Sequence, residues 1–194
     1  MVVLNRIYTR TGDDGTTALG DMSRVDKNDS RLHAYADVDE ANSCLGVAIA
    51  AGSLPADVGT LLTRVQNELF DVGADLCTPV VDNPEFPPLR VEQSYIDRLE
   101  GECDSFNERV EALRSFVLPG GSNGSAYLHV ARTVTRRAER STWAALAVHG
   151  ESMNALTAHY LNRLSDLLFI LSRVANLPEH GGPGDVLWLP GGTR

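Results

Sequence analysis

The apolar positions of this chain recur at helical spacing over five separate stretches. Between residues 61 and 76, leucines and valines follow one another mostly at intervals of three and four, which predicts an amphipathic helix. A similar pattern predicts an earlier helix from residue 31 to about 52. Three further helices are predicted over 93 to about 113, about 125 to 148, and from near 151 until Pro178.

The stretches between these helices carry residues that end or exclude helices. Residues 78–89 hold four prolines, and residues 118–124 hold three glycines after a proline, so both are predicted to be loops. The candidate N-caps of the first and fourth helices are Asp29 or Ser30 and Ser122 or Asn123. Because neither a repeat nor a domain linker interrupts the pattern, it predicts one all-α domain, a five-helix up-and-down bundle. Its parts would be an N-terminal segment 1–30, the bundle 31–177 and a tail 178–194.

Composition narrows the possible partners. The 194 residues suffice for one full core, and an apolar share of 43% is that of an ordinary globular protein. The net charge of −9 argues against nucleic acid or an anionic membrane as a partner, because both would repel the chain. No run approaches the roughly 18 apolar residues of a membrane span, and the first residues do not resemble a signal peptide. Three cysteines without paired spacing indicate reduced thiols in the cytoplasm, and no metal-ligand pattern is present.

The N-terminal segment concentrates glycine, threonine and positive charge. Gly12 and Gly15 can adopt positive φ and direct successive N–H groups at one anion, although the Walker phosphate-loop pattern is absent. The hydroxyl and basic side chains that would add phosphate donors are Thr9, Thr11, Thr16, Thr17, Arg6, Arg10 and Lys27. An ordinary Asp-Gly turn that joins two short strands explains the same residues, and such turns are more common.

The predicted fourth helix carries four arginines within nine residues of an otherwise acidic chain, at positions 132, 136, 137 and 140. Like charges four residues apart repel by about 0.2–0.5 kcal/mol per pair unless an anion lies between them. Guanidinium groups suit a polyphosphate, so the cluster is a candidate site for one. A solvated face balanced by Glu139 and by acids of neighbouring helices fits the spacing equally well.

Acidic and polar residues on two other predicted helices need partners if they are buried. Asp39, beside Asp37 and Glu40, would find one in an arginine of the fourth helix. Asn162 and Asp166 share a face of the fifth helix, where interhelical hydrogen bonding is a more common role than catalysis. The five histidines form no metal-binding or catalytic pattern and are expected at the surface or between helices.

Three segments, in this order along the chain, together resemble the ATP:cob(I)alamin adenosyltransferases of the PduO type. They are residues 7–17 (IYTRTGDDGTT) followed by 38–42 (VDEAN), residues 129–140 (HVARTVTRRAER) and residues 160–169 (YLNRLSDLLF). Each segment alone is a weak signal, but their shared order over most of the chain makes the resemblance specific. It implies a ferritin-like five-helix bundle that assembles as a homotrimer, with ATP held at the subunit interfaces.

The resemblance also implies roles for individual residues. Arg132 would pair with Asp39 across the bundle, and the N-terminal loop would wrap the triphosphate. Mg²⁺ would bridge oxygens of ATP without a protein ligand. The residues expected to contact or position ATP are Tyr8, Thr9, Arg10, Thr11, Gly12, Asp13, Gly15, Thr16, Thr17, Lys27, Arg136, Arg137, Glu139 and Asn162. Arg10 stands where lysine is usual in this family, which keeps the charge but changes its shape.

The implied reaction is attack of cob(I)alamin on C5′ of ATP, which gives adenosylcobalamin and tripolyphosphate. Proximity and stabilisation of the leaving charge would suffice, without a general base. Phe116 would displace the lower axial ligand of the corrinoid and make its Co(II) form easier to reduce; packing in the core is the alternative role for this side chain. The tail residues Leu187 and Trp188 are candidates for closing over the corrinoid.

Two other functions remain open. A non-catalytic trimer would bind ATP and deliver adenosylcobalamin to a client enzyme that depends on it. A nucleic-acid-binding helical protein would use the arginine cluster, which the charge of −9 disfavours. The three segments favour the enzyme. Its product would also be used by an enzyme that depends on adenosylcobalamin.

Overall fold

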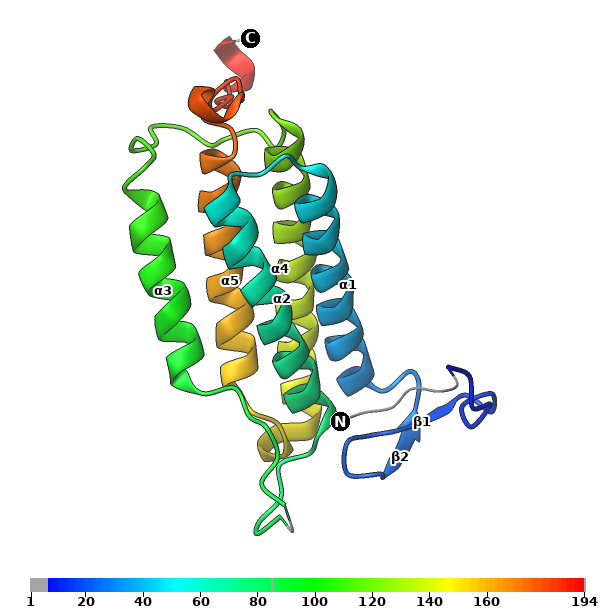
Figure 1. The fold of residues 1–194 in the computed structure, drawn as a ribbon. Helices are drawn as coiled ribbons and strands as arrows, with labels where there is room; N and C mark the ends of the chain where they lie inside the picture. The colour runs from blue at the N-terminus through cyan, green and yellow to red at the C-terminus, as the bar shows by residue number, and fades with distance from the viewer. Residues whose placement is uncertain (1–6, 85, 194) are drawn as a thin grey trace.

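Five long helices run alternately up and down beside one another (Figure 1). The structure is a computed structural model that describes residues 7–84 and 86–193. The helices are α1 (Ser30–Ala51), α2 (Ala56–Cys77), α3 (Gln93–Asn107), α4 (Asn123–His149) and α5 (Leu156–Val174). Short 3₁₀ turns occupy Gly150–Ser152, Pro178–His180 and Gly191–Thr193. The predicted five-helix up-and-down bundle is confirmed.

Two of the helix starts lie where the sequence predicted them. The side chain of Asp29 accepts a hydrogen bond from the backbone N–H of Arg31 at 2.7 Å, which caps α1. Ser122 caps α4 in the same way, by accepting from the N–H of Ser125 at 3.2 Å. Each cap satisfies one of the N–H groups that the first turn of a helix leaves unpaired.

Two predicted boundaries were wrong. α3 ends at Asn107 and not near residue 113, and the guanidinium of Arg109 instead reaches Asp57 at the start of α2, at 2.5 Å. α5 begins at Leu156 and not near residue 151, because Asn154 holds its start. The amide oxygen of Asn154 accepts from the N–H of Leu156 at 3.0 Å, while its NH₂ group donates to Asp75 at 2.7 Å. Tertiary contacts, which a local pattern does not contain, set both ends.

A small ribbon precedes the bundle. Strands β1 (Thr16–Ala18) and β2 (Arg24–Asp26) pair antiparallel, with Thr17 opposite Val25. Each strand has only three residues, so the sequence shows almost no strand pattern that would predict them.

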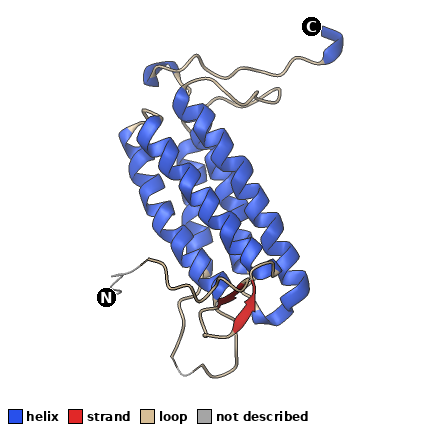
Figure 2. Ribbon diagram, turned by 90° about the vertical axis from the view of Figure 1, so that its right-hand side faces the viewer, coloured by secondary structure: helices blue, strands red, loops and turns tan. Residues whose placement is uncertain are grey.

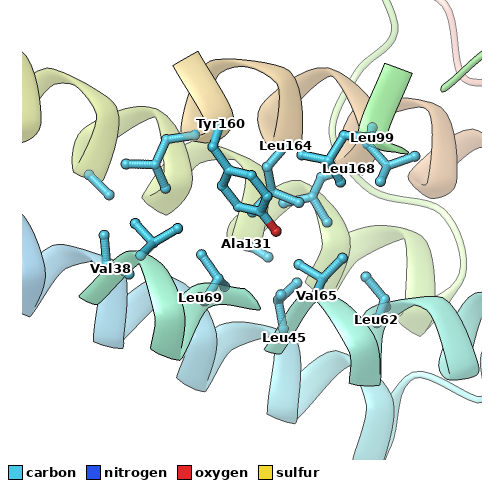
Figure 3. Packing of buried hydrophobic residues seen from close by; sticks show 14 of the residues in the cluster. Val38, Leu45, Leu62, Val65, Leu69, Leu99, Ala131, Tyr160, Leu164 and Leu168 are labelled. Carbon is cyan, nitrogen blue, oxygen red and sulfur yellow. The ribbon is translucent and has the colours of Figure 1, made fainter. Parts of the chain in front are cut away.

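The core lies where α1, α2, α4 and α5 face one another and where α3 packs against α5, and most of it is leucine, valine and alanine (Figure 3). Tyr160 is the largest side chain in this core and has no exposed surface. Its hydroxyl donates to the carboxylate of Glu68 at 2.8 Å, and Arg98 of α3 reaches the same carboxylate at 3.2 Å. Burial raises the pKa of Tyr160 well above its ordinary value. The buried hydroxyl therefore stays protonated and acts as a donor to Glu68.

Replacing Tyr160 by phenylalanine should lower the free energy of unfolding by about 1–2 kcal/mol, because a buried carboxylate oxygen of Glu68 loses its donor. Urea denaturation followed by circular dichroism measures this. The matched control is Tyr95→Phe, since Tyr95 is only partly buried and donates to Asp71 at 3.0 Å. Equal losses in the two variants would contradict the importance of the buried bond.

Candidate functional site

The N-terminal segment lies beside the lower end of the bundle, where α1 begins (Figures 1 and 2). The N–H of Gly20 donates to the carbonyl of Cys77 at the end of α2, at 2.9 Å. A Cβ at Gly20 would come within 2.2 Å of the Thr78 hydroxyl, so this approach requires glycine. The buried guanidinium of Arg31 ties the same region together by donating to the carbonyls of Leu76 at 3.0 Å and Ser152 at 3.1 Å. The segment is therefore mounted on a rigid end of the bundle.

The expected ATP-binding residues of this segment form a series of tight turns. Arg10 has φ of 63° and Gly15 has φ of 85°, so the backbone turns left-handed on both sides of Gly12. A Cβ built on Gly12 would lie 3.1 Å from Nζ of Lys27, so these two predicted residues come together. The hydroxyls of Thr9 and Thr11 share a hydrogen bond of 2.9 Å. The exposed loop thus gathers hydroxyl and basic groups around one turn.

The alternative interpretation of an Asp-Gly turn between two strands was wrong. Gly15 precedes β1, and the two strands are instead joined by residues 19–23. Asp14 accepts from the N–H of Thr16 at 3.0 Å and from its hydroxyl at 2.8 Å, and the hydroxyl bond, followed by the backbone bond, lowers the pKa of Asp14.

Arg24, the first residue of β2, contacts this loop and was not among the site residues predicted from the sequence. It donates to the carbonyl of Thr11 at 2.6 Å and to the hydroxyl of Thr16 at 3.1 Å, so it braces the loop against β1. Each strand of the ribbon has only three residues, so the sequence held no pattern that indicated this role.

Within this chain the acid on α1 that faces an arginine of α4 is Asp37, and the predicted contact of Asp39 with an arginine of α4 is not made among the described residues. Arg137 reaches Asp37 at 3.3 Å and also bonds to Glu40. Ser141 donates to the second oxygen of Asp37 at 2.5 Å. Two residues further along a helix, a side chain is rotated by about 200°, so Asp39 faces solvent.

Among the charged side chains of the predicted site, Asp39, Arg132 and Arg136 have no hydrogen bond or ion pair within the described residues. Nε of Arg132 is buried all the same, and burial followed by repulsion from Arg136 lowers the pKa of Arg132. Arg132 lies five residues before Arg137, about 7.5 Å nearer the start of α4, which removes it from the level of Asp39. Glu139 is partly buried on α4, whereas Arg136 and Asn162 are exposed on α4 and α5.

A cavity of about 850 Å³ lies at the upper end of the bundle, near the start of α4. Phe116 is 78% exposed at its edge, so the alternative that this side chain packs in the core was wrong. Its ring meets that of Trp188 edge-on, with centroids 6.0 Å apart. The complete lining is Leu113, Arg114, Ser115, Phe116, Val117, His129, Arg132, Phe169, Trp188 and Pro190. The cavity thus joins an aromatic wall to the first arginine of the cluster.

The tail builds the outer wall of this cavity. The N–H of Trp188 donates to the carbonyl of Phe116 at 2.7 Å, and the N–H of Leu118 donates to Val186 at 2.8 Å, around an antiparallel bridge between Val117 and Leu187. Trp188, one of the two tail residues expected to close over the corrinoid, thus lies beside Phe116.

The loop and the cavity lie at opposite ends of the same chain. In Figure 2 the ribbon of strands is below the helices, and the tail that walls the cavity is above them. α1 alone, with 22 residues, separates the two ends by about 33 Å. One chain therefore cannot bring its own loop to its own cavity.

The buried His129 gives the stability of the protein a pH dependence. Burial, and then repulsion from Arg132, lower the pKa of His129, while Asp185 acts in the opposite direction. Below pH about 6.5 the unfolded chain takes up a proton that the folded chain resists, so the free energy of unfolding falls. In His129→Phe the fall between pH 7.5 and pH 5.5 should be smaller, as urea denaturation at each pH would show. An identical pH profile in the two proteins would refute this linkage.

Over residues 7–84 and 86–193, no three His, Cys, Asp or Glu side chains are grouped so that they could hold a metal ion. In that same part of the chain, no helix is both long and apolar enough to cross a membrane.

Comparison with known proteins places these features in a family. A family model described as cobalamin adenosyltransferase matches residues 7–175. The corrinoid adenosyltransferase of Mycobacterium tuberculosis is 65% identical over 193 residues, which cover 100% of this chain and 97% of that protein. The corrinoid adenosyltransferase of Bacillus subtilis is 39% identical over 184 residues, which cover 93% of this chain and 91% of that protein.

Two solved structures of variants of the PduO-type adenosyltransferase from Lactobacillus reuteri are also similar. One, complexed with cobalamin and ATP, has a TM-score of 0.84 and 35% identity, and covers 95% of this chain and 100% of that chain. The other, complexed with ATP, has a TM-score of 0.81 and 36% identity, and covers 94% of this chain and 100% of that chain. Sequence and fold agree over nearly the whole length, and the chain therefore belongs to the cobalamin adenosyltransferase family.

Proposed function

We propose that this cobalamin adenosyltransferase transfers the 5′-deoxyadenosyl group of ATP to cob(I)alamin at a site shared between two copies of the chain. ATP lies between the N-terminal segment of one copy and the α4–α5 face of the next, and the corrinoid enters the aromatic cavity. The observation that carries this arrangement is that one chain holds its loop and its cavity at opposite ends. A second copy can bring a loop to that cavity.

The unpartnered charges support the same arrangement. Nε of Arg132 is buried without a partner, and the exposed carboxylate of Asp39 has none among the residues that the structure describes. A polar atom that is buried without a hydrogen-bond partner costs about 1–3 kcal/mol. We assign Asp39 to Arg132 of an adjacent copy, which would satisfy both groups and fix the register between subunits.

ATP binding is assigned to the loop residues 8–13 and 15–17, to Lys27, and to the arginine-bearing face. The left-handed turns at Arg10 and Gly15 let backbone N–H groups converge on phosphate oxygens. Among the described residues the guanidinium of Arg136 has no partner, and Glu139 of α4 and Asn162 of α5 are assigned to the same site. Arg137 already bonds to Asp37 and Glu40, so its part is to hold this face in place beside the nucleotide.

The reaction needs positioning and charge more than acid–base chemistry. Cobalt of cob(I)alamin supplies an electron pair to C5′, the C5′–O bond breaks, and the electrons leave on tripolyphosphate. Mg²⁺ bound with ATP would neutralise part of the triphosphate charge. The guanidinium of Arg136 and the loop N–H groups would stabilise the leaving charge, and holding the reactants together supplies the remaining advantage.

Phe116 is assigned to the lower face of the corrinoid. Its exposed ring projects at the cavity edge and is held against Trp188. An apolar ring below cobalt excludes a donor ligand, and loss of that donor stabilises the lower oxidation state. The closing tail then keeps water from that face.

The assembly is proposed to be a homotrimer in the cytoplasm. Three free thiols, each with a pKa raised by burial, fit a reducing compartment. The adenosylcobalamin formed would pass to an enzyme that depends on it.

The activity is tested by incubating the protein with ATP and chemically reduced cobalamin. A light-sensitive alkylcobalamin spectrum should appear, and tripolyphosphate should form in equal amount. If neither product forms although ATP binds, the chain is instead an ATP-binding carrier module.

The shared site is tested by mixing two variants. Asp39→Asn and Arg136→Ala should each have low activity, and a mixture refolded together should regain part of it, because some interfaces combine two intact halves. A mixture no more active than the average of the two variants would place all of the site within one chain.

A further inference from the structure

His129 is a buried polar side chain in the wall of the aromatic cavity, and one of its ring nitrogens has no hydrogen-bond partner among the described residues. It is 4% exposed, and its Nδ1 atom is fully buried without a hydrogen-bond partner. Its ring contacts the ring of Phe169 edge-on, with centroids 6.3 Å apart, and both residues line the cavity. Nearly all buried polar atoms in proteins are hydrogen-bonded, and the imidazole borders the cavity, so a polar group of a ligand bound there is one source of the missing partner.

The imidazole is neutral at physiological pH. Burial and the nearby Arg132 both lower the pKa of His129, and Asp185 opposes them. The other charged group of the cavity is Arg114, which is exposed on the segment before α4, and Asp185 is itself paired with Arg173 of α5 at 2.8 Å. A neutral imidazole offers one donor and one acceptor.

We propose that His129 hydrogen-bonds a primary carboxamide on the rim of the corrin ring and so positions the macrocycle against Phe116. This inference rests on the proposed function, which places the corrinoid in this cavity. Primary carboxamides are the neutral polar groups that surround the corrin of cobalamin. Each offers both a donor and an acceptor, so it matches the imidazole in either tautomer. The remaining wall is largely apolar or aromatic and suits the face of the macrocycle.

Replacement by phenylalanine and by glutamine separates this role from packing. His129→Phe keeps a ring against Phe169 but removes both nitrogens, whereas His129→Gln keeps a donor and an acceptor. We expect His129→Phe to raise the KM for cob(I)alamin, and the Kd of the oxidised corrinoid measured by absorption titration, about fivefold to tenfold. The KM for ATP should not change. His129→Gln should recover most of the lost affinity.

The matched control is His159→Phe. His159 is exposed on α5 and tilted against Trp143, with centroids 5.8 Å apart, outside the cavity. This variant should bind the corrinoid like the wild type.

Three results would overturn the inference while leaving the proposed function intact. In the first, the wild type is active and the Kd of the corrinoid is unchanged in His129→Phe. In the second, His129→Phe changes the KM for ATP and the KM for cob(I)alamin equally. In the third, His129→Gln recovers none of the lost corrinoid affinity. An unchanged Kd together with a higher melting temperature in His129→Phe would show that the nitrogen meets only water. A different outcome would refute the proposed function and still support the contact between His129 and the corrinoid. In that outcome the wild type forms no alkylcobalamin but binds the corrinoid more tightly than His129→Phe does.

Discussion

Replacing Arg136 by alanine should lower kcat/KM for ATP at least about tenfold while the protein remains folded. Its guanidinium is exposed and has no partner among the described residues, so the fold loses little. Loss of one hydrogen bond to a charged phosphate costs about 1.5–3 kcal/mol, and about 1.4 kcal/mol corresponds to a tenfold change. Initial rates at varied ATP, with saturating cob(I)alamin, measure the effect.

Arg140→Ala is the matched control for this variant. Arg140 lies four residues later on the same exposed face, and its guanidinium donates to the carbonyl of Arg136 at 3.0 Å. Removing it takes the same charge from the same helix, so a purely electrostatic effect would appear in both variants. Wild-type kinetics in Arg136→Ala, or equal losses in the two, would exclude a specific contact between Arg136 and the nucleotide.

Replacing Phe116 by alanine should damage the Co(II)-dependent reaction far more than the Co(I)-dependent one. Without the ring, water or the lower ligand of the corrinoid can return to cobalt, and the Co(II) form becomes harder to reduce. When cob(I)alamin is supplied chemically, this step is bypassed and the rate should stay within about tenfold of the wild type. Two assays decide it, one with a flavin reductant and cob(II)alamin, the other with chemically formed cob(I)alamin.

Leu118→Ala controls for damage to the segment before α4 that contains Phe116. Leu118 is 44% exposed on the same stretch, but it does not line the cavity. Because Phe116 is 78% exposed, neither variant should alter the melting temperature much. Parallel losses of both reactions in Phe116→Ala would indicate a general loosening of the cavity wall.

Most of the fold could be predicted from helical periodicity and from the residues that cap helices. The caps at Asp29 and Ser122 and the proline-rich loop at 78–89 follow from local rules, and the structure agrees with them. The end of α3 and the start of α5 do not follow from local rules, since distant side chains such as Asp57 and Asp75 set them.

The site was harder to predict, because it depends on helix phase and on what each helix faces. Asp37 and Asp39 are the same type of residue. Only their different directions around the axis of α1 place Asp37, and not Asp39, beside Arg137. The same limit hid His129, since a lone histidine in an apolar helix gives no sign that its Nδ1 will lack a partner. Arg24 gained its bracing role from a three-residue ribbon, which is too short to leave a pattern.

The way the outer wall of the cavity is built has a consequence for how fast a large ligand can come and go. That wall is a two-stranded bridge held by the bonds Trp188 to Phe116 and Leu118 to Val186, with one further bond from the Ser115 hydroxyl to the Trp188 carbonyl at 2.9 Å. Opening so few bonds costs far less free energy than unfolding a helix of the core. A macrocycle can thus exchange by local peeling of the tail, while the helices that hold the nucleotide keep their amide protons protected.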